Sequence, residues 1–345
     1  MKIRSSSKSP TQLFGELSDG SKVYSHEISN SNGMSLKVMD YGATVIALKK
    51  SLKNGKVVDV VLGFDALSDY VDSYSLPSAP YFGATVGRFA GRIANATFDL
   101  NGKSIVLHQN NNGNALHGGI EGFSQKRWQL EQLKSDQNPS VSFSYTSPAG
   151  EEQYPGELKV SITYTLTEEN ELEIEYKATT NEPTVVNLTH HSYFNLEGQH
   201  GSVLEQELQI NATQVLATKA MIPTGELLPV QDTEWDYTNL KSCPEAIDTT
   251  FAVNTKETLV ATLLSKENNL KMEVYTNQPG LHVYVGGNCF TQIKGKENAS
   301  YHSQSGICFE TQNFPDAPNH PNFPSAILLP GDIYFHKTIY KFQSF

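Results

Sequence analysis

The chain has 345 residues, of which 37 are Asp or Glu and 26 are Lys or Arg, giving a formal net charge of -11 at pH 7. Nucleic acids and anionic membranes are bound mainly through basic patches, so this acidic balance argues against both kinds of partner. The three cysteines, Cys243, Cys289 and Cys308, lie far apart and form no C-x-x-C pair. They predict neither a disulfide framework nor a zinc site, and they favour a reducing, cytoplasmic location.

The N-terminus, MKIRSSSKSPTQLFGEL, begins with basic residues but contains no apolar stretch, so no secretory signal is expected. No apolar run approaches the length of a membrane span. We expect a loose tail over residues 1–12 and one domain over residues 13–345. Length alone would allow two domains, but the polar motifs described below extend from Arg92 to Glu310 and must converge to form one site.

Short strands separated by turn residues account for most of the chain. Asn32-Gly33 and Asn101-Gly102 are typical hairpin dipeptides, each lying between two alternating segments. The expected strands include Val23–Ile28, Ser35–Met39, Val57–Leu62, Thr97–Leu100, Ser104–Leu107, Val141–Tyr145, Leu158–Thr167, Leu172–Thr179, Met272–Tyr275 and Ile333–Phe342. Within 158–167, apolar and polar residues alternate as in an antiparallel strand with one solvated face. Helical periodicity is confined to Asp65–Ser73, so the fold class is all-β, with stacked antiparallel sheets.

Two glycine-rich segments carry candidate binding residues. In YFGATVGRFAGRIANATF, residues 81–98, Arg92 offers a fork of donors that suits sugar hydroxyls, although an arginine beside glycines often only fastens a loop. In NNNGNALHGGIEGFSQKRW, residues 110–128, His117 precedes two glycines among side-chain amides. It can bind a substrate or satisfy its own loop, and the pattern leaves both interpretations open.

The segment NLTHHSYFNL, residues 187–196, contains two adjacent histidines. If it is a strand, adjacent side chains point to opposite faces, so His190 and His191 cannot enter one pocket or chelate one ion together. The residues expected on the pocket face are Asn187, Thr189, His191, Tyr193 and Asn195. An imidazole in that setting is suited to act as a general acid or base.

Glu310 lies where a predicted core strand, SGICFET, runs into the proline-rich loop QNFPDAPNHPNFP. Buried carboxylates are costly unless paired or functional, so Glu310 is either a catalytic base or a carboxylate held by loop amides. Asp248 in AIDTTF and His282 in QPGLHVYVGGN lie at the ends of further expected strands. The residues alone do not separate an epimerase from a hydrolase, for which Asp248 and Glu310 would be the carboxylate pair.

The chain resembles the galactose mutarotase (aldose 1-epimerase) family from about Leu13 to Phe345. The resemblance rests on six segments in the order and spacing of that family: YFGATVGRFAGRIANATF, NALHGGIEGF, VVNLTHHSYFNL, AIDTTF, QPGLHVYVGGN and ICFETQNFPDAPNHPNFPS. It implies a single-domain β-sandwich of large antiparallel sheets, the supersandwich of that family. It also implies cofactor-free and metal-free interconversion of the α and β anomers of aldohexoses, usually galactose and glucose.

Matched position by position, the resemblance implies that Glu310 is the catalytic base and His191 the catalytic acid. His117 matches a second pocket histidine, and Arg92 and Asp248 match residues that hydrogen-bond sugar hydroxyls.

The chain departs from the family pattern at three positions. Gly91 stands where Asn is usual, and we expect it to leave a space in the pocket. His190 stands where Asn is frequent, and His282, a further expected substrate-binding residue, stands where some members have Gln. These differences leave the preferred sugar open.

Three rival functions would place other demands on the chain. A hexose-6-phosphate 1-epimerase on the same fold would need additional cations for the phosphate. A non-catalytic carbohydrate-binding protein would have no need of both Glu310 and His191. A glycoside hydrolase would be revealed by cleavage of glycosides. We expect a free monosaccharide as the partner, no metal ligand set, and a monomer or weak homodimer.

Overall fold

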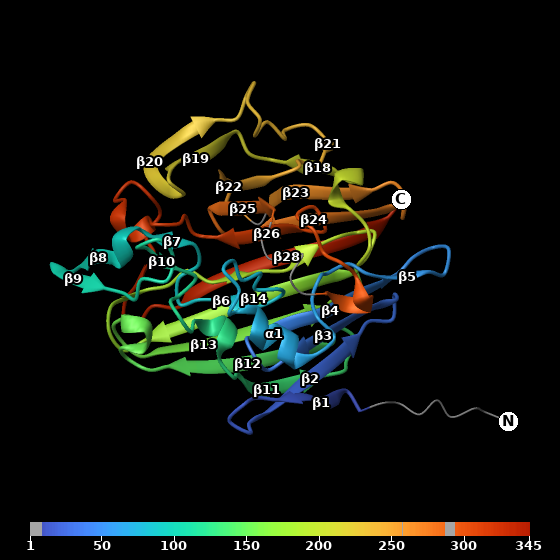
Figure 1. Ribbon diagram of the computed structural model, residues 1–345, viewed down its shortest axis with the longest axis horizontal. Helices are drawn as coiled ribbons and strands as arrows, with labels where there is room; N and C mark the ends of the chain where they lie inside the picture. The colour runs from blue at the N-terminus through green and yellow to red at the C-terminus, as the bar shows by residue number, and fades with distance from the viewer. Residues whose placement is uncertain (1–8, 257, 287–293) are drawn as a thin grey trace.

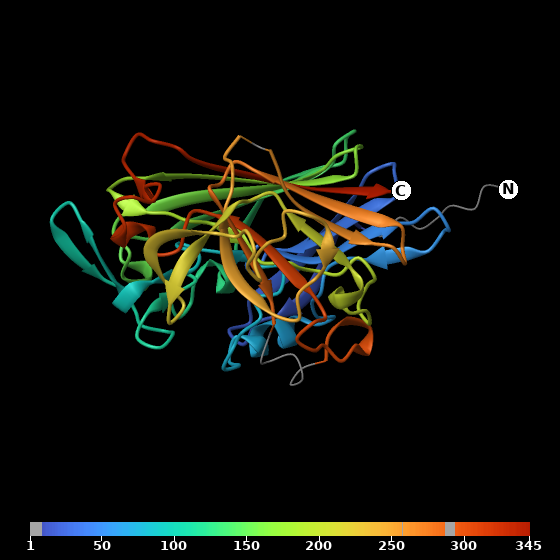
Figure 2. The ribbon, with the colours of Figure 1, turned by 90° about the horizontal axis from the view of Figure 1, so that it is seen from above.

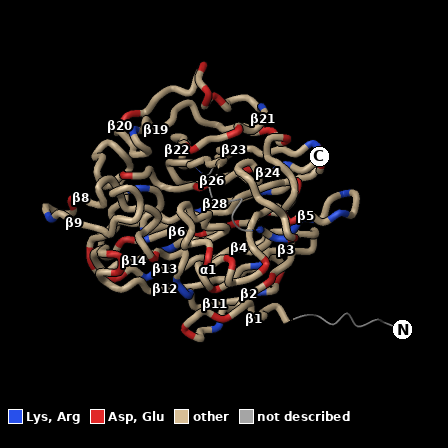
Figure 3. The backbone as a smooth tube through the Cα atoms, in the orientation of Figure 1, with Lys and Arg blue, Asp and Glu red and all other residues tan. Residues whose placement is uncertain are grey.

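The computed structural model describes residues 9–256, 258–286 and 294–345, and antiparallel strands dominate it (Figure 1). Its α-helix, α1 (Leu67–Ser73), covers most of the helix expected from the sequence. None of the helices in the described residues is long and apolar enough to span a membrane. Lys and Arg are interspersed with Asp and Glu along the chain (Figure 3).

The largest sheet has nine antiparallel strands. In spatial order they are β11 (Gln129–Lys134), β12 (Ser140–Ser147), β13 (Leu158–Leu166), β14 (Glu171–Thr180), β28 (Tyr334–Ser344), β24 (Leu270–Thr276), β23 (Thr258–Ser265), β18 (Glu207–Ile210) and β21 (Lys241–Ser242). The final strand of the chain therefore lies between β14 and β24 and joins the two halves of the sheet.

Two further sheets have six and five strands. The six-stranded sheet has the order β17 (Tyr193–Phe194), β26 (Ile307–Gln312), β25 (Gly280–Val285), β22 (Ile247–Ala252), β19 (Gln214–Lys219) and β20 (Ile222–Pro229). The five-stranded sheet runs in sequence order through β1 (Thr11–Glu16), β2 (Lys22–Ser29), β3 (Met34–Met39), β4 (Thr44–Ser51) and β5 (Val57–Asp59).

Short two-stranded ladders complete the described strands. They pair β6 (Thr85–Val86) with β16 (Thr189–His190), β7 (Arg92–Ile93) with β10 (Ala115–Leu116), β8 (Thr97–Leu100) with β9 (Lys103–Val106), and β15 (Thr184–Val185) with β27 (Ile327–Leu328). Single 3-10 turns lie at Ala94–Ala96, Phe123–Gln125, Glu151–Gln153, Val203–Glu205, Lys296–Asn298 and Ala317–Asn319.

The nine-stranded sheet forms one layer and packs against the other two sheets (Figure 2). Tyr340 of β28 donates a hydrogen bond to the carbonyl of Phe309 in β26 at 2.8 Å, and Tyr164 of β13 donates to the carbonyl of Ala43 at 2.5 Å. The main hydrophobic cluster between the layers draws on residues from Ile28 to Phe342. The expected all-β sandwich is thus the observed fold class.

Local patterns predicted several elements well. Alternate residues of β13 are buried from Leu158 to Leu166. Asn101 and Gly102 both have positive φ, 55° and 76°, as a tight hairpin between β8 and β9 requires. The tail boundary at residue 12 was wrong, because Thr11 and Gln12 pair with β2 in β1. The strand expected over 57–62 ends as β5 at Asp59.

Candidate active site

A pocket opens on the face of the six-stranded sheet that points away from the nine-stranded sheet. In β26, Thr311 Oγ1 lies 3.0 Å from Nε2 of His336 in β28, so Thr311 faces the nine-stranded sheet. Alternation along the strand points Glu310 and Gln312 to the other side. There they line a cavity of about 640 Å³.

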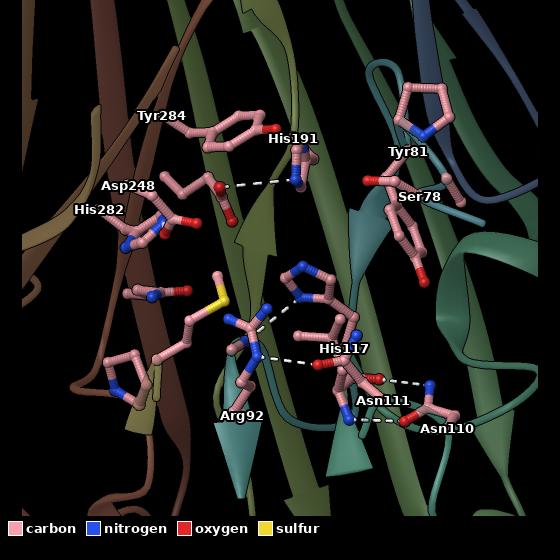
Figure 4. A pocket seen from close by; sticks show the side chains of 18 of the residues that line it. Ser78, Tyr81, Arg92, Asn110, Asn111, His117, His191, Asp248, His282 and Tyr284 are labelled. Atoms are coloured by element: carbon pink, nitrogen blue, oxygen red, sulfur yellow. Dashed lines mark hydrogen bonds and ion pairs between the residues drawn. The ribbon is translucent and has the colours of Figure 1, made fainter. Parts of the chain in front are cut away.

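Register brings polar side chains of three adjacent strands into rows beneath this cavity. Glu310 pairs with His282 of β25, and His282 pairs with Thr250 of β22. In the next row Tyr284 pairs with Asp248. Figure 4 shows Asp248, His282 and Tyr284 on one side of the pocket, Tyr81 and Ser78 on the other, and His191, His117 and Arg92 between them.

Glu310 and His191 lie side by side in the pocket. His191 Nε2 is 3.5 Å from Glu310 Oε1, and the two side chains are 6% and 3% exposed. The other carboxylate oxygen, Oε2, is buried and has no hydrogen-bond partner among the described residues. A buried acceptor without a partner costs about 1–3 kcal/mol, so a hydroxyl that donates to this oxygen would relieve an unfavourable state.

The imidazole of His191 is held between neighbours on both sides. Its Nδ1 lies 3.7 Å from Cys308 Sγ, and its ring stacks on Tyr81 with centroids 5.8 Å apart. Burial lowers the pKa of His191, and the negative charge of Glu310 opposes this shift without reversing it. Nε2 is directed toward Glu310, whose negative charge favours the protonated ring against the effect of burial.

His190 points away from the pocket, as strand alternation predicted. Its Nε2 lies 2.7 Å from Ser192 Oγ, and its ring lies 6.1 Å from the ring of Tyr164 and 6.4 Å from that of Tyr340, on the side of the nine-stranded sheet. Burial lowers the pKa of His190 to about 3. The two adjacent histidines thus occupy different environments.

The prediction of one continuous pocket face over residues 187–195 was wrong in part. His191 and Tyr193 line the cavity, whereas Asn187, Thr189 and Asn195 donate hydrogen bonds to backbone carbonyls elsewhere. The reason is that the segment is not one strand. It pairs with β6 as β16, breaks, and pairs with β26 as β17.

The loop that carries His117 requires glycine after the histidine. Gly118 has φ +91°, and a Cβ there would lie 1.9 Å from the carbonyl oxygen of Gly87. The backbone N–H of Gly91 donates to His117 Nδ1 at 3.2 Å, so the ring proton of neutral His117 sits on Nε2. Burial, together with the charges of His191 and Arg92, holds the pKa of His117 well below its ordinary value.

His117, His191 and Glu310 bring three potential metal-ligand atoms within 4.8 Å of one another. The expectation that no such set exists was therefore wrong, because the fold gathers residues that are far apart in the sequence. A metal ion binds the unprotonated nitrogen of an imidazole. Since the Gly91 N–H occupies Nδ1 of His117 and leaves the proton on Nε2, this set suits a hydrogen-bond donor better than a metal ligand.

The two arginines of the glycine-rich segment have different roles. Arg88 is 2% exposed and donates to the carbonyls of Pro155 and Gly156, so it fastens loops. Arg92 lines the pocket, and its Nε donates to Asn111 Oδ1 at 3.0 Å, which orients the guanidinium. Burial lowers the pKa of Arg92, and the charges of Asp248 and Glu310 oppose that shift.

Gly91 does not leave a space in the pocket, so that expectation was wrong. Its φ is +76°, and a Cβ there would lie 2.9 Å from Cβ of Pro315. Proline is rigid and side chains are strained at this φ, so an added amide would disturb the backbone before it reached a ligand.

Asp248 and His282 form a pair at the side of the pocket. His282 Nε2 lies 3.2 Å from Asp248 Oδ1, and His282 Nδ1 lies 2.9 Å from Thr250 Oγ1. Burial acts to lower the pKa of His282, but the hydrogen bond to Asp248 and the charge of Glu310 outweigh it and raise that pKa. Burial likewise acts to raise the pKa of Asp248, but His282 and Arg92 outweigh it and lower that pKa.

All six predicted site residues therefore line one cavity. Sequence reasoning missed several other polar residues that line it: Tyr81, Asn111, Thr250, Tyr284 and Gln312. Three of these lie two positions from a predicted residue on the same strand, so period-two alternation from Asp248, His282 and Glu310 could have identified them.

The pattern of the aldose 1-epimerase family matches residues 24–341 of this chain. The galactose mutarotase of Homo sapiens is 40% identical over 344 residues, covering 96% of this chain and 97% of the human protein. The chain belongs to the aldose 1-epimerase family. It is therefore an isomerase of the class that interconverts aldose anomers.

More distant aldose 1-epimerase relatives agree. The aldose 1-epimerase of Escherichia coli K12 is 32% identical, covering 94% of this chain and 96% of that protein. The structure of an aldose epimerase homologue from C. elegans has a TM-score of 0.85 at 30% identity, covering 92% of this chain and 98% of that one. Galactose 1-epimerase from Lactobacillus acidophilus has a TM-score of 0.83 at 26% identity, covering 96% and 98%. The family expected from the sequence is confirmed.

Proposed function

We propose that this aldose 1-epimerase family member interconverts the α and β anomers of free aldohexoses, galactose and glucose, with Glu310 as the base and His191 as the acid. The observation that carries the proposal is the pair of buried side chains, 3.5 Å apart, one of which presents an unpartnered carboxylate oxygen in the pocket. Relatives at 39% and 40% identity are named galactose mutarotase.

Ring opening needs two proton transfers at neighbouring oxygens. The anomeric hydroxyl loses its proton to Glu310 while the ring oxygen gains a proton from protonated His191. Both oxygens are bonded to C1, so the base and the acid must lie close together, and a separation of 3.5 Å meets this requirement.

The open-chain aldehyde then turns over by rotation about the C1–C2 bond. Re-closure runs the same transfers in reverse, so each residue acts once as acid and once as base. The anomers have the same composition and oxidation state, and the net reaction therefore consumes no redox or group-transfer partner. Positioned acid–base groups contribute about 10²–10⁴-fold each.

The remaining predicted residues suit the sugar hydroxyls. His117 offers a donor at Nε2, because its Nδ1 accepts a hydrogen bond from the Gly91 N–H. Arg92 offers further donors. Asp248 offers an acceptor beside His282. A polyhydroxylated ring requires both donors and acceptors, because each hydroxyl can donate and accept a hydrogen bond.

A phosphorylated sugar fits the pocket less well. Among the described lining residues, Arg92 is the one Lys or Arg side chain, and the negative charges of Asp248 and Glu310 already act on it. A phosphate dianion would therefore meet a site with no surplus of fixed positive charge.

That the protein is a monomer or weak homodimer in the cytoplasm stays a prediction.

Polarimetry tests the proposal. Fresh solutions of α-D-galactose and α-D-glucose should reach equilibrium rotation faster with the protein than without it. The same assay on glucose 6-phosphate and on a galactoside separates the rivals, because a 6-phosphate epimerase would prefer the former and a hydrolase would release free sugar from the latter. Failure to accelerate exchange of either free sugar would refute the proposal.

A further inference from the structure

Gln312 lies in the pocket wall with an unused polar group. It is two residues after Glu310 in β26, so it faces the same side of the sheet. The residue is 1% exposed and lines the cavity, and its Oε1 is buried without a hydrogen-bond partner among the described residues. Buried amides are normally paired, and leaving one unpaired is costly.

The cross-strand neighbours of Gln312 have small side chains or none. Gln312 pairs in register with Gly280 of β25, which has no side chain, and Gly280 pairs with Ala252 of β22. The row that holds Glu310 and His282 carries large side chains, whereas this row carries small ones. The space over Gly280 is filled, because a Cβ there would lie 3.1 Å from Phe314 Cδ1 and 3.2 Å from Thr250 Cγ2. A ligand therefore meets the Gln312 amide from the cavity that Gln312 lines.

The distance along the strand suits one sugar ring. Residues two apart in a strand are separated by about 6.6 Å, which is close to the distance between hydroxyls on opposite sides of a pyranose. A ring whose anomeric hydroxyl meets Glu310 can thus place a remote hydroxyl near Gln312. An amide can both donate to a hydroxyl and accept from it.

We propose that Gln312 binds a hydroxyl of the sugar remote from C1 and thereby helps to select the aldose, an inference that rests on the function proposed above. The ligand class is a neutral aldopyranose that carries this hydroxyl. A site that pairs a buried amide with a substrate hydroxyl discriminates against the analogue that lacks the hydroxyl, because the amide is left unpaired.

The test combines one substitution with a series of sugars. The kcat/KM for anomer exchange is measured for galactose and its 2-, 3-, 4- and 6-deoxy analogues in the native protein and in Gln312→Met, which is similar in length. The native protein should lose about 10- to 100-fold on one remote deoxy sugar. Gln312→Met should lose a similar factor on galactose and nothing further on that deoxy sugar.

Gln278→Met is the matched control. Gln278 is also buried, but its Nε2 donates to Asn277 Oδ1 and it does not line the cavity. It should leave the pattern across the sugars unchanged. If Gln312→Met does not fold, Gln312→Asn keeps the amide but withdraws it from the ring, and the discrimination should weaken in the same sugar.

Two outcomes overturn the inference. A Gln312 variant that loses the same factor on every sugar would show a purely structural role, and a variant with no loss would show that the amide is not used. Calorimetric binding of the same sugars keeps this separate from the proposed reaction. If the native protein exchanged no anomers but bound galactose through Gln312, the proposed function would fail and the hydroxyl site would stand.

Discussion

Replacing Glu310 with Gln should abolish mutarotation without harming the fold. Gln keeps the shape of the side chain but cannot take the anomeric proton. Because a positioned base contributes about 10²–10⁴-fold, kcat should fall by at least about 10²-fold. At about 1.4 kcal/mol per tenfold, that loss is about 3 kcal/mol of transition-state stabilisation.

Although Glu310→Gln should lose activity, its thermal stability should rise or stay the same. Glu310 Oε2 is buried without a partner among the described residues, and burial lowers the pKa of His191 beside it, which weakens compensation of the carboxylate charge by that ring. A neutral amide is less costly to bury than an uncompensated carboxylate. The thermal midpoint of Glu310→Gln should therefore equal or exceed that of the native protein.

Polarimetry gives the rate and differential scanning calorimetry gives the midpoint. Glu273→Gln is a matched control, because Glu273 is only 13% exposed but is paired with Lys271 Nζ at 2.6 Å, in the nine-stranded sheet. It should keep full activity and lose a little stability. A folded Glu310→Gln protein with near-normal kcat would refute the assignment of Glu310 as the base. A thermal midpoint several degrees below that of the native protein would refute the idea that the carboxylate charge is uncompensated.

His191→Asn should remove most activity, whereas His190→Asn should spare turnover and lower the thermal midpoint; equal losses of turnover would contradict the opposite orientations of the two rings. Arg92→Met and Asp248→Asn should raise KM more than they lower kcat in steady-state kinetics, because contacts to hydroxyls act alike in the ground and transition states. Burial lowers the pKa of His336 from 6.5 to about 3. As the pH falls below 6.5, this side chain is therefore protonated in the unfolded protein while it stays neutral in the folded one. The free energy of unfolding should then decrease from pH 6.5 toward pH 3, by up to about 1.4 kcal/mol per pH unit. In His336→Gln, the urea midpoint should fall less steeply as the pH is lowered. EDTA should leave the rate unchanged; a loss that added metal restores would contradict a metal-free reaction.

Features that depend on a few neighbouring residues could be predicted from the sequence. Alternation over Leu158–Leu166 gave a strand with one buried face, and Asn101-Gly102 gave a tight turn, because both follow from local backbone geometry. Alternation also separated His190 from His191 without knowledge of their partners. The family resemblance named five of the six candidate site residues in advance, and it marked His282 as a departure at a sixth position.

The meeting of those residues was decided by the tertiary structure. His117, His191 and Glu310 come from a loop, a broken strand and an unbroken strand, and their proximity depends on β17 pairing with β26. The assignment of Arg88 to the loops and Arg92 to the pocket likewise depends on which carbonyls lie within reach.

Packing also decided what local patterns could not express. Gly91 suggests an empty position in the sequence, but Pro315 fills the space beside it. The amide of Gln312 looks ordinary in the sequence, and only the folded chain shows that Oε1 is buried and unpaired among the described residues. The physical reason is that periodicity fixes the direction of a side chain relative to its own strand, whereas its partners are set by strands that are distant in sequence.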